Sequence, residues 1–180
     1  MKPSNVLLVF LVCCGTAFGA GSDTILTPGG LGPVKVGMTL REASQALGVK
    51  LKRESPNDPD SKYCDFAHRA DGNDSEINYM IKDGHIARID VGDAAHERSI
   101  IKTAEGVGLG STERAVKKAY GRALKVEPHP YGDGDPDGWH YLVIDEPGHK
   151  RGIIFETDGR KVTSFRAGEY PALGYIEGCS

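Results

Sequence analysis

One acidic segment of this sequence has the residue types and spacing of a cation-binding loop. In DGDPDG, at 133–138, carboxylates occupy positions one, three and five and glycine occupies position six, which is how a calcium loop opens. Position twelve, where such a loop needs a bidentate glutamate, is Ile144, and Pro136 fits poorly within it. We therefore expect a solvated loop, and calcium binding by Asp133, Asp135 and Asp137 is the alternative.

Other motifs with chemical potential fail on spacing. Gly106, Gly108 and Gly110 precede a predicted helix, but the third glycine of a dinucleotide fingerprint would fall at Ser111, so we expect only a turn. The six histidines include no HExxH pair, and no G-x-S-x-G motif is present. The sequence predicts a protein that is not an enzyme and needs no metal or cofactor, with an unrecognised hydrolase as an alternative.

Cysteine placement and the N-terminus predict an exported protein. Residues 1–20 combine one lysine, an apolar run too short for a retained anchor, and small residues before a cleavage point near Ala20. Acylation of Cys13 or Cys14 is the alternative fate of this segment. After cleavage only Cys64 and Cys179 remain, and in an oxidising compartment we expect them to form a disulfide rather than free thiols. The predicted location is the periplasm or the extracellular medium, with no membrane-spanning segment after cleavage.

A repeated segment indicates how the chain is organised. GMTLREASQALG at 37–48 recurs as GSTERAVKKAYG at 110–121, with five of twelve positions identical. Each copy begins with a glycine turn and a threonine N-cap, Thr39 or Thr112, and Glu42 completes a capping box in the first. We therefore expect two repeats, 24–98 and 99–180, which together form one compact domain.

Strand signals follow each predicted helix. The segments 77–91 and 152–168 both contain an Asp-Gly pair between apolar runs, which predicts a hairpin. Further strands are expected at 63–68 and 139–144, with short lead-in strands at 34–36 and 107–109. The predicted fold class is α+β, with an antiparallel sheet of about six to eight strands and the two helices on one face.

Alternation along these strands places a candidate binding group on the face away from the helices. If Ala87, Ile89 and Val91 point to the helices, Arg88 and Asp90 point away. In the second hairpin Thr163, Phe165 and Ala167 point inward, and Ser164 and Arg166 outward. Trp139 and Tyr141 share one face of their strand. Arginine with Trp and Tyr is the composition that interfaces favour, so the candidate residues are Arg88, Asp90, Ser164, Arg166, Trp139 and Tyr141. The alternative is a solvated face without a binding role, with the aromatic side chains in the core.

Charge restricts the class of partner. The chain carries 22 basic and 25 acidic residues, well mixed, for a net charge of −3. It has no basic stripe that could follow a phosphate backbone, so nucleic acid is not an expected partner.

The Gly37-Met38-Thr39 helix entry leading into a hairpin resembles small envelope domains of the SmpA/OmlA type. Two such units in tandem, exported and disulfide-linked, resemble the β-lactamase-inhibitor protein architecture, although one disulfide serves both repeats here. The resemblance implies a non-catalytic envelope module that binds or inhibits another protein with the open face of its sheet. The alternative is a small-ligand or carbohydrate binder that uses Trp139 and Tyr141 as stacking platforms.

Overall fold

The computed structural model of the chain describes residues 24–73, 76–92, 99–132 and 138–179. The predicted signal segment 1–20, the cysteines within it, and the calcium candidates Asp133, Asp135 and Asp137 lie outside these residues. Among the described residues, no helix has the length and apolar character needed to cross a membrane. Two α-helices, α1 (Leu40–Leu47) and α2 (Glu113–Tyr120), accompany two sheets, which confirms the α+β class.

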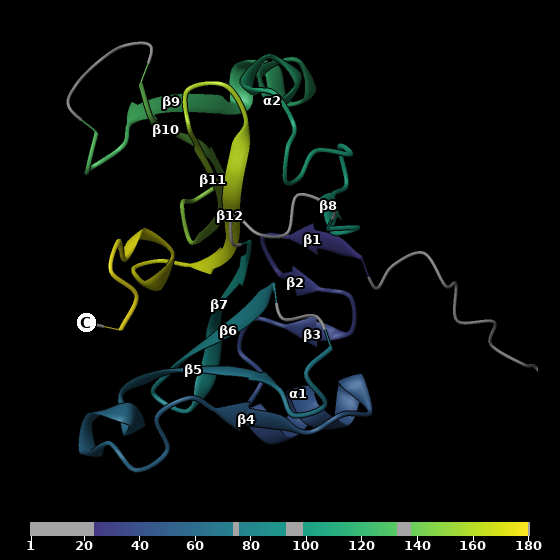
Figure 1. Cartoon of the computed structure of the whole chain (residues 1–180), viewed down its shortest axis with the longest axis vertical. Coiled ribbons are helices and arrows are strands. Elements are labelled where there is room, and N and C mark those ends of the chain that lie inside the picture. Colours follow the sequence, from purple (N-terminus) through teal and green to yellow (C-terminus); the bar gives the residue numbers. More distant parts are fainter. Residues whose placement is uncertain (1–23, 74–75, 93–98, 133–137, 180) are drawn as a thin grey trace, which may run out of the picture.

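The larger sheet has eight strands in the order β4-β5-β6-β7-β12-β11-β10-β9, and every neighbouring pair is antiparallel. This confirms the predicted antiparallel sheet. Strands β7 and β12 meet at its centre, so the strands before residue 92 form one half and those after residue 123 the other (Figure 1). The bounds are β4 Leu51–Arg53, β5 Cys64–Arg69, β6 Ile77–Lys82, β7 His85–Val91, β9 Leu124–Pro128, β10 His140–Asp145, β11 Arg151–Thr157 and β12 Val162–Glu169.

The smaller sheet was not predicted. Its strands are β1 (Ile25–Thr27), β2 (Gly30–Leu31), β3 (Val34–Lys35) and β8 (Lys102–Thr103), and β1 pairs with β8 in parallel. The lead-in strand expected at 34–36 is β3, whereas 107–109 forms no strand and contributes one bridge, from Gly108 to Lys102. The edge strands β4 and β9 were also missed, because short exposed strands carry little apolar alternation.

Both helices begin as the sequence predicts. The backbone N–H of Thr39 donates to Glu42 Oε2 at 2.8 Å, and the N–H of Glu42 donates to Thr39 Oγ1 at 3.3 Å, which forms the capping box. At α2, the N–H of Ala115 donates to Thr112 Oγ1 at 3.2 Å. Each N-cap threonine also forms an isolated β-bridge with the hairpin that follows it: Thr39 pairs with His85, and Thr112 pairs with Lys161. An eight-residue helix is marginal alone, so these contacts hold each helix onto the sheet.

The main hydrophobic core lies between the larger sheet and the layer formed by the helices and the smaller sheet. Ala43 of α1 and Val116 of α2 belong to the same buried cluster, as do Tyr79 and Phe155 from opposite halves of the larger sheet. In Figure 1 the smaller sheet lies to the right of the larger one and the yellow C-terminal residues lie to its left. The two halves therefore share one core.

Two β-bulges alter the predicted facing of single residues. The pairing register between β6 and β7 shifts between Met80 and Ile81, so Ala87 on β7 has no register partner on β6. Ala87 consequently packs with Met80 on the face away from the helices, where the simple alternation had placed it inward. The pairing register between β11 and β12 shifts in the same way after Glu156. Thr163 therefore has no register partner on β11, and it is exposed. The inward predictions for Ala87 and Thr163 are wrong because a bulge adds one residue to a strand and reverses the alternation at that point.

The start of α2 is fixed to the sheet by a buried carboxylate. Glu113 Oε1 accepts from Thr157 Oγ1 at 2.6 Å and lies 2.7 Å from His140 Nδ1, while Oε2 accepts from Lys117 Nζ at 2.8 Å. Burial opposes ionisation of this carboxyl, but the hydrogen bonds from Lys117, Thr157 and His140 outweigh it and lower the pKa of Glu113. His140 thus faces the helices, opposite to its neighbours Trp139 and Tyr141, as alternation predicts.

The closest backbone approach at the centre of the larger sheet depends on Gly168, whose register partner on β7 is Arg88. A Cβ at this position would lie 2.3 Å from the Ala87 carbonyl oxygen and 2.7 Å from Arg88 Cα. Gly168→Ala should therefore lower the free energy of unfolding by about 3 kcal/mol, as overpacking does when backbone must move. Urea denaturation measures this. Gly174→Ala is the control, because a Cβ there has its nearest neighbour at 3.9 Å; equal stability of the two variants would contradict the prediction.

Candidate binding surface

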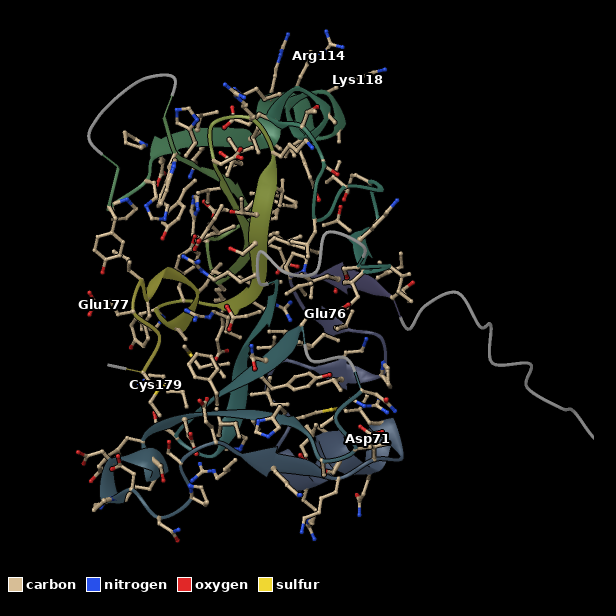
Figure 2. The ribbon with its side chains drawn as sticks, in the orientation of Figure 1. Asp71, Glu76, Arg114, Lys118, Glu177 and Cys179 are labelled. Carbon is tan, nitrogen blue, oxygen red and sulfur yellow. A yellow bond between two sulfur atoms is a disulfide. The ribbon has the colours of Figure 1, made fainter. Side chains whose placement is uncertain are left out.

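The face of the larger sheet away from the helices is covered at its centre by the C-terminal segment, residues 170–179, which contains the short helix η3 (Ala172–Gly174). Ala172 is buried against Met80 and Ala87, and Leu173 packs with Tyr141 and other side chains of β10 and β11. Figure 2 shows Glu177 and Cys179 on the side of the molecule away from the smaller sheet. The expected open face is therefore occupied by the chain itself.

The two arginines predicted for this face hold the C-terminal segment in place. Arg88 Nη1 donates to the carbonyl oxygens of Ala172 at 2.9 Å and Tyr175 at 2.8 Å. Arg166 Nε donates to the carbonyl oxygen of Leu173 at 2.9 Å. Both arginines point away from the helices as expected, but their exposure was predicted wrongly, because only 4% and 5% of their surfaces are accessible.

Carboxylates balance both buried guanidinium groups. Arg88 Nε lies 2.9 Å from Asp90 Oδ1, and Arg166 Nη1 donates to Glu156 Oε1. Burial raises the pKa of Asp90 above its ordinary value, and the attraction of Arg88 acts against that shift. Asp90 is thus a structural partner of Arg88, while Ser164 is half-buried on β12 beside Glu156.

The disulfide predicted from the cysteine count is present. Cys64, at the start of β5, is bonded to Cys179 across 115 positions, with a Cα–Cα distance of 5.4 Å. The bond attaches the end of the C-terminal segment to the first half of the larger sheet. Gly178 lies against the Phe66 ring, where a Cβ would come within 2.9 Å of a ring carbon. The segment is thus fixed covalently at its end and by hydrogen bonds along its length.

A group of aromatic rings lies beside the C-terminal segment on the second half of the sheet. His129 is 8% exposed, and its ring centroid is 4.6 Å from that of Tyr141, 5.5 Å from that of Trp139 and 5.9 Å from that of Tyr131. The guanidinium of Arg166 lies 5.1 Å from the Tyr141 ring centroid. Trp139 and Tyr141 share a face, but Tyr141 is buried at 7% exposure and Trp139 is 55% exposed. Only Trp139 of this predicted pair is available to a ligand.

A cavity of about 200 Å³ opens beside Trp139. Half of its lining residues belong to β11 and the turn after it; the lining residues are His129, Trp139, Glu156, Thr157, Asp158 and Thr163. His129 lies here, whereas His140 faces the helices, so the sheet separates these two histidines. Among the described residues, no three His, Cys, Asp or Glu side chains are grouped to hold a metal ion.

Two further residues complete this surface without a signal in the sequence. His129 is buried, and Glu156 accepts a hydrogen bond from Arg166 and lies 3.8 Å from His129 Nε2. No pattern in the sequence distinguishes either residue. One feature of the sequence indicated that residues 170–179 pack on the sheet, namely the predicted Cys64–Cys179 bond. That bond implied that the C-terminus returns to β5, although it did not indicate which face the segment crosses.

Comparisons of this chain with protein-family models, with curated proteins and with solved structures found no match. The assignment of a function therefore rests on the geometry and chemistry of the surface itself.

Arg166→Ala should destabilise the protein by about 3 kcal/mol, because it leaves Glu156 and the Leu173 carbonyl without their buried donor. This reverses the small effect expected of an exposed arginine. Arg151→Ala is the matched control: Arg151 forms an ion pair with Glu146 at 3.0 Å but is 42% exposed, so its loss should cost about 1 kcal/mol or less. Thermal and urea unfolding of both variants measure these losses. A near-zero effect of Arg166→Ala would show that the buried contact adds nothing to the free energy of unfolding.

Proposed function

We propose that this protein is an exported, non-catalytic binding module that engages another protein. The proposed docking surface consists of the C-terminal segment and the aromatic side chains around it. The observation that supports it is the clustering of exposed large apolar side chains. Of the seven such side chains among the described residues, four lie on or beside the C-terminal segment: Tyr131, Trp139, Tyr170 and Ile176, with exposures of 60%, 55%, 37% and 46%.

Composition and rigidity both favour a protein partner. Tyr and Trp are enriched in protein interfaces, and exposed apolar clusters on soluble proteins commonly mark interaction sites. Tyr131 donates to Glu177, and Tyr170 donates to Asp145 Oδ1 at 2.8 Å, so both rings are held in place. A surface held before binding loses less conformational entropy when the partner arrives. This proposal modifies the sheet-face binding implied by the resemblance to envelope modules, since the segment replaces the bare sheet.

We further propose that residues 24–98 and 99–180 are two copies of one unit. In support, each half follows its helix with four antiparallel strands, and the strand order is reversed about β7 and β12. Gly37 N–H donates to the Ile86 carbonyl oxygen at 2.8 Å, and Gly110 N–H donates to that of Val162 at 2.9 Å, so both helix entries contact the following hairpin. A periplasmic or secreted location is proposed from the predicted signal segment, and the disulfide is compatible with an oxidising compartment.

Photo-crosslinking tests the docking surface. A benzoylphenylalanine residue replaces Tyr131, Trp139 or Ile176, one at a time, in cells that naturally make the protein. All three positions should yield an adduct with the same partner, because they border one surface. Val126 is the control, since its register partner Leu142 belongs to the core on the helix side and Val126 therefore lies on the other face, 48% exposed. Adducts of equal yield at Val126, or none at the three surface positions, would refute the proposed surface.

Substitution of Trp139 measures how much this side chain contributes to partner affinity. Trp139→Ala should weaken affinity for the crosslinked partner by about 2 kcal/mol or more, as removal of a central interface aromatic does. Its effect on folding should be about 1 kcal/mol or less, because the side chain is more than half exposed. Binding and unfolding measurements on one preparation separate the two effects. Unchanged affinity would remove Trp139 from the interface.

Carbohydrate binding is a second candidate function, favoured by one observation. The exposed indole of Trp139 borders the cavity whose other walls include Glu156, Asp158 and Thr163. Sugars bind where an aromatic ring offers a stacking surface and nearby polar groups accept or donate hydrogen bonds to hydroxyls.

The single tryptophan of the chain makes this candidate easy to test. Titration with neutral oligosaccharides should change Trp139 fluorescence saturably if sugars enter the cavity. Thr163→Val removes one exposed hydroxyl at nearly constant volume, and affinity should then fall by about threefold, as expected for one neutral hydrogen bond. The absence of a fluorescence response across the panel would exclude this candidate for the sugars tested.

A further inference from the structure

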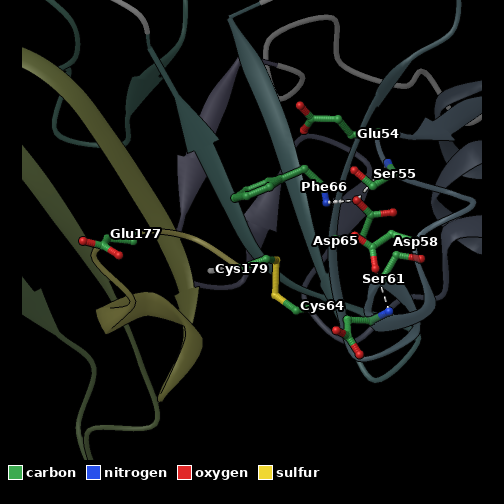
Figure 3. Close-up of a pocket in the computed structure, with 10 residues that line it drawn as sticks. Glu54, Ser55, Asp58, Ser61, Cys64, Asp65, Phe66, Glu177 and Cys179 are labelled. Atoms are coloured by element: carbon green, nitrogen blue, oxygen red, sulfur yellow. Dashed lines mark hydrogen bonds between the residues drawn. A yellow bond between two sulfur atoms is a disulfide. The ribbon is translucent and has the colours of Figure 1, made fainter.

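A second cavity, of about 310 Å³, lies where the C-terminal segment meets β5 and the turn before it. Half of its lining is acidic: of ten residues, five carry carboxylates, and no lysine, arginine or histidine is among them. The acidic lining residues are Glu54, Asp58, Asp60, Asp65 and Glu177. Figure 3 shows Ser55, Asp58 and Asp65 gathered on one side of this cavity and Glu177 on the other, with the disulfide between them.

Asp65 distinguishes this cavity from an ordinary acidic surface. The residue is only 4% exposed, yet its Oδ2 atom receives no hydrogen bond from any residue that the structure describes. The other oxygen, Oδ1, accepts from the backbone N–H of Ser55 at 3.2 Å and of Phe66 at 2.8 Å. Arg53 Nε lies 3.7 Å from Oδ2, which is an ion pair beyond hydrogen-bonding distance. A buried carboxylate oxygen without a donor is unfavourable, and a bound donor would relieve it.

The charge and shape of the cavity indicate the chemistry of that donor. Five carboxylates around one space favour a cation, and the donor must reach an atom at the buried wall, which a side chain with an apolar stem can do. The Phe66 ring lines the cavity and would lie alongside such a stem. The acidic groups include no metal-holding cluster of three among the described residues. An arginine or lysine side chain therefore suits the site better than a bare metal ion.

We propose that this cavity receives a basic side chain of the partner protein, with Asp65 Oδ2 accepting a hydrogen bond from it. The inference rests on the proposed function, because it specifies the chemistry of the partner that docks on the C-terminal segment. Glu177 links the two regions: it lines the cavity and accepts a hydrogen bond from Tyr131, which belongs to the docking surface. A partner with an apolar patch flanked by an exposed arginine or lysine fits both regions together.

Nuclear magnetic resonance titration of the disulfide-bonded protein tests the site without the partner. The probe is acetyl-Gly-Arg-Gly-amide, and the matched control peptide carries citrulline, which has the shape of arginine without its charge. The arginine peptide should shift the amide signals of Ser55 and Phe66 saturably, since both N–H groups donate to Asp65 Oδ1. The citrulline peptide should shift them much less. Binding should weaken as salt is raised, because the attraction is screened.

Three variants locate the binding energy. Asp65→Asn keeps the Oδ1 acceptor and should raise the dissociation constant of the arginine peptide about tenfold, as loss of a charged hydrogen bond does. Asp65 is buried, so a Glu54→Gln/Asp58→Asn double variant, altered only at exposed residues, should give a rise of about threefold even if Asp65→Asn misfolds. Glu169→Gln removes an exposed carboxylate on β12, away from the cavity lining, and should change nothing.

Several results would overturn the proposal: equal binding of the citrulline peptide, unchanged affinity in both the Asp65 and the double variant, or calcium alone producing the same amide shifts. Each leaves the crosslinking test intact. Adducts at Trp139 and Ile176 with no peptide binding would reject the basic-side-chain site and keep the docking surface, whereas peptide binding without adducts would reject the docking surface.

Discussion

Two buried guanidinium groups, those of Arg88 on β7 and Arg166 on β12, donate hydrogen bonds to the backbone carbonyls of the C-terminal segment. A buried arginine is stabilised when its donors find acceptors and its charge finds a counterion. The carbonyls of Ala172, Leu173 and Tyr175 supply acceptors, while Asp90 and Glu156 supply charge. Removal of the segment would leave both arginines on a bare sheet face, so these hydrogen bonds fix the position of the segment across the junction of β7 and β12.

This arrangement determines what is exposed on the side opposite the helices. The sheet itself is hidden at its centre, and the exposed material is a short segment secured at one end by the Cys64–Cys179 bond. At one border lie Trp139 and Tyr131 with a small cavity, and at the other lie the carboxylates around Asp65. Apolar and acidic regions therefore lie along one fixed segment, and the partner proposed above would meet both of them.

Several elements follow directly from local sequence. Thr39 with Glu42 forms the capping box that its spacing requires, and the Asp83-Gly84 turn has positive φ at both positions, as a tight hairpin needs. Strand alternation correctly placed Arg88 and Arg166 on one face. It misplaced Ala87 and Thr163, because a bulge depends on the pairing register of two strands and cannot be predicted from the sequence of either strand alone.

The sequence by itself determined the α+β class, the helix starts and both hairpins, because caps, turns and alternation act within a few residues. It also determined the pairing of Cys64 with Cys179, because these are the two cysteines that remain after the predicted cleavage. Only the tertiary structure decided that the predicted binding arginines are buried and that Tyr141 lies beneath His129 while Trp139 stays accessible. Exposure depends on which distant segment covers a face. Residues 170–179 cross β7 and β12 through contacts spanning up to 87 positions, as between Arg88 and Tyr175, and no local pattern encodes a contact of that range.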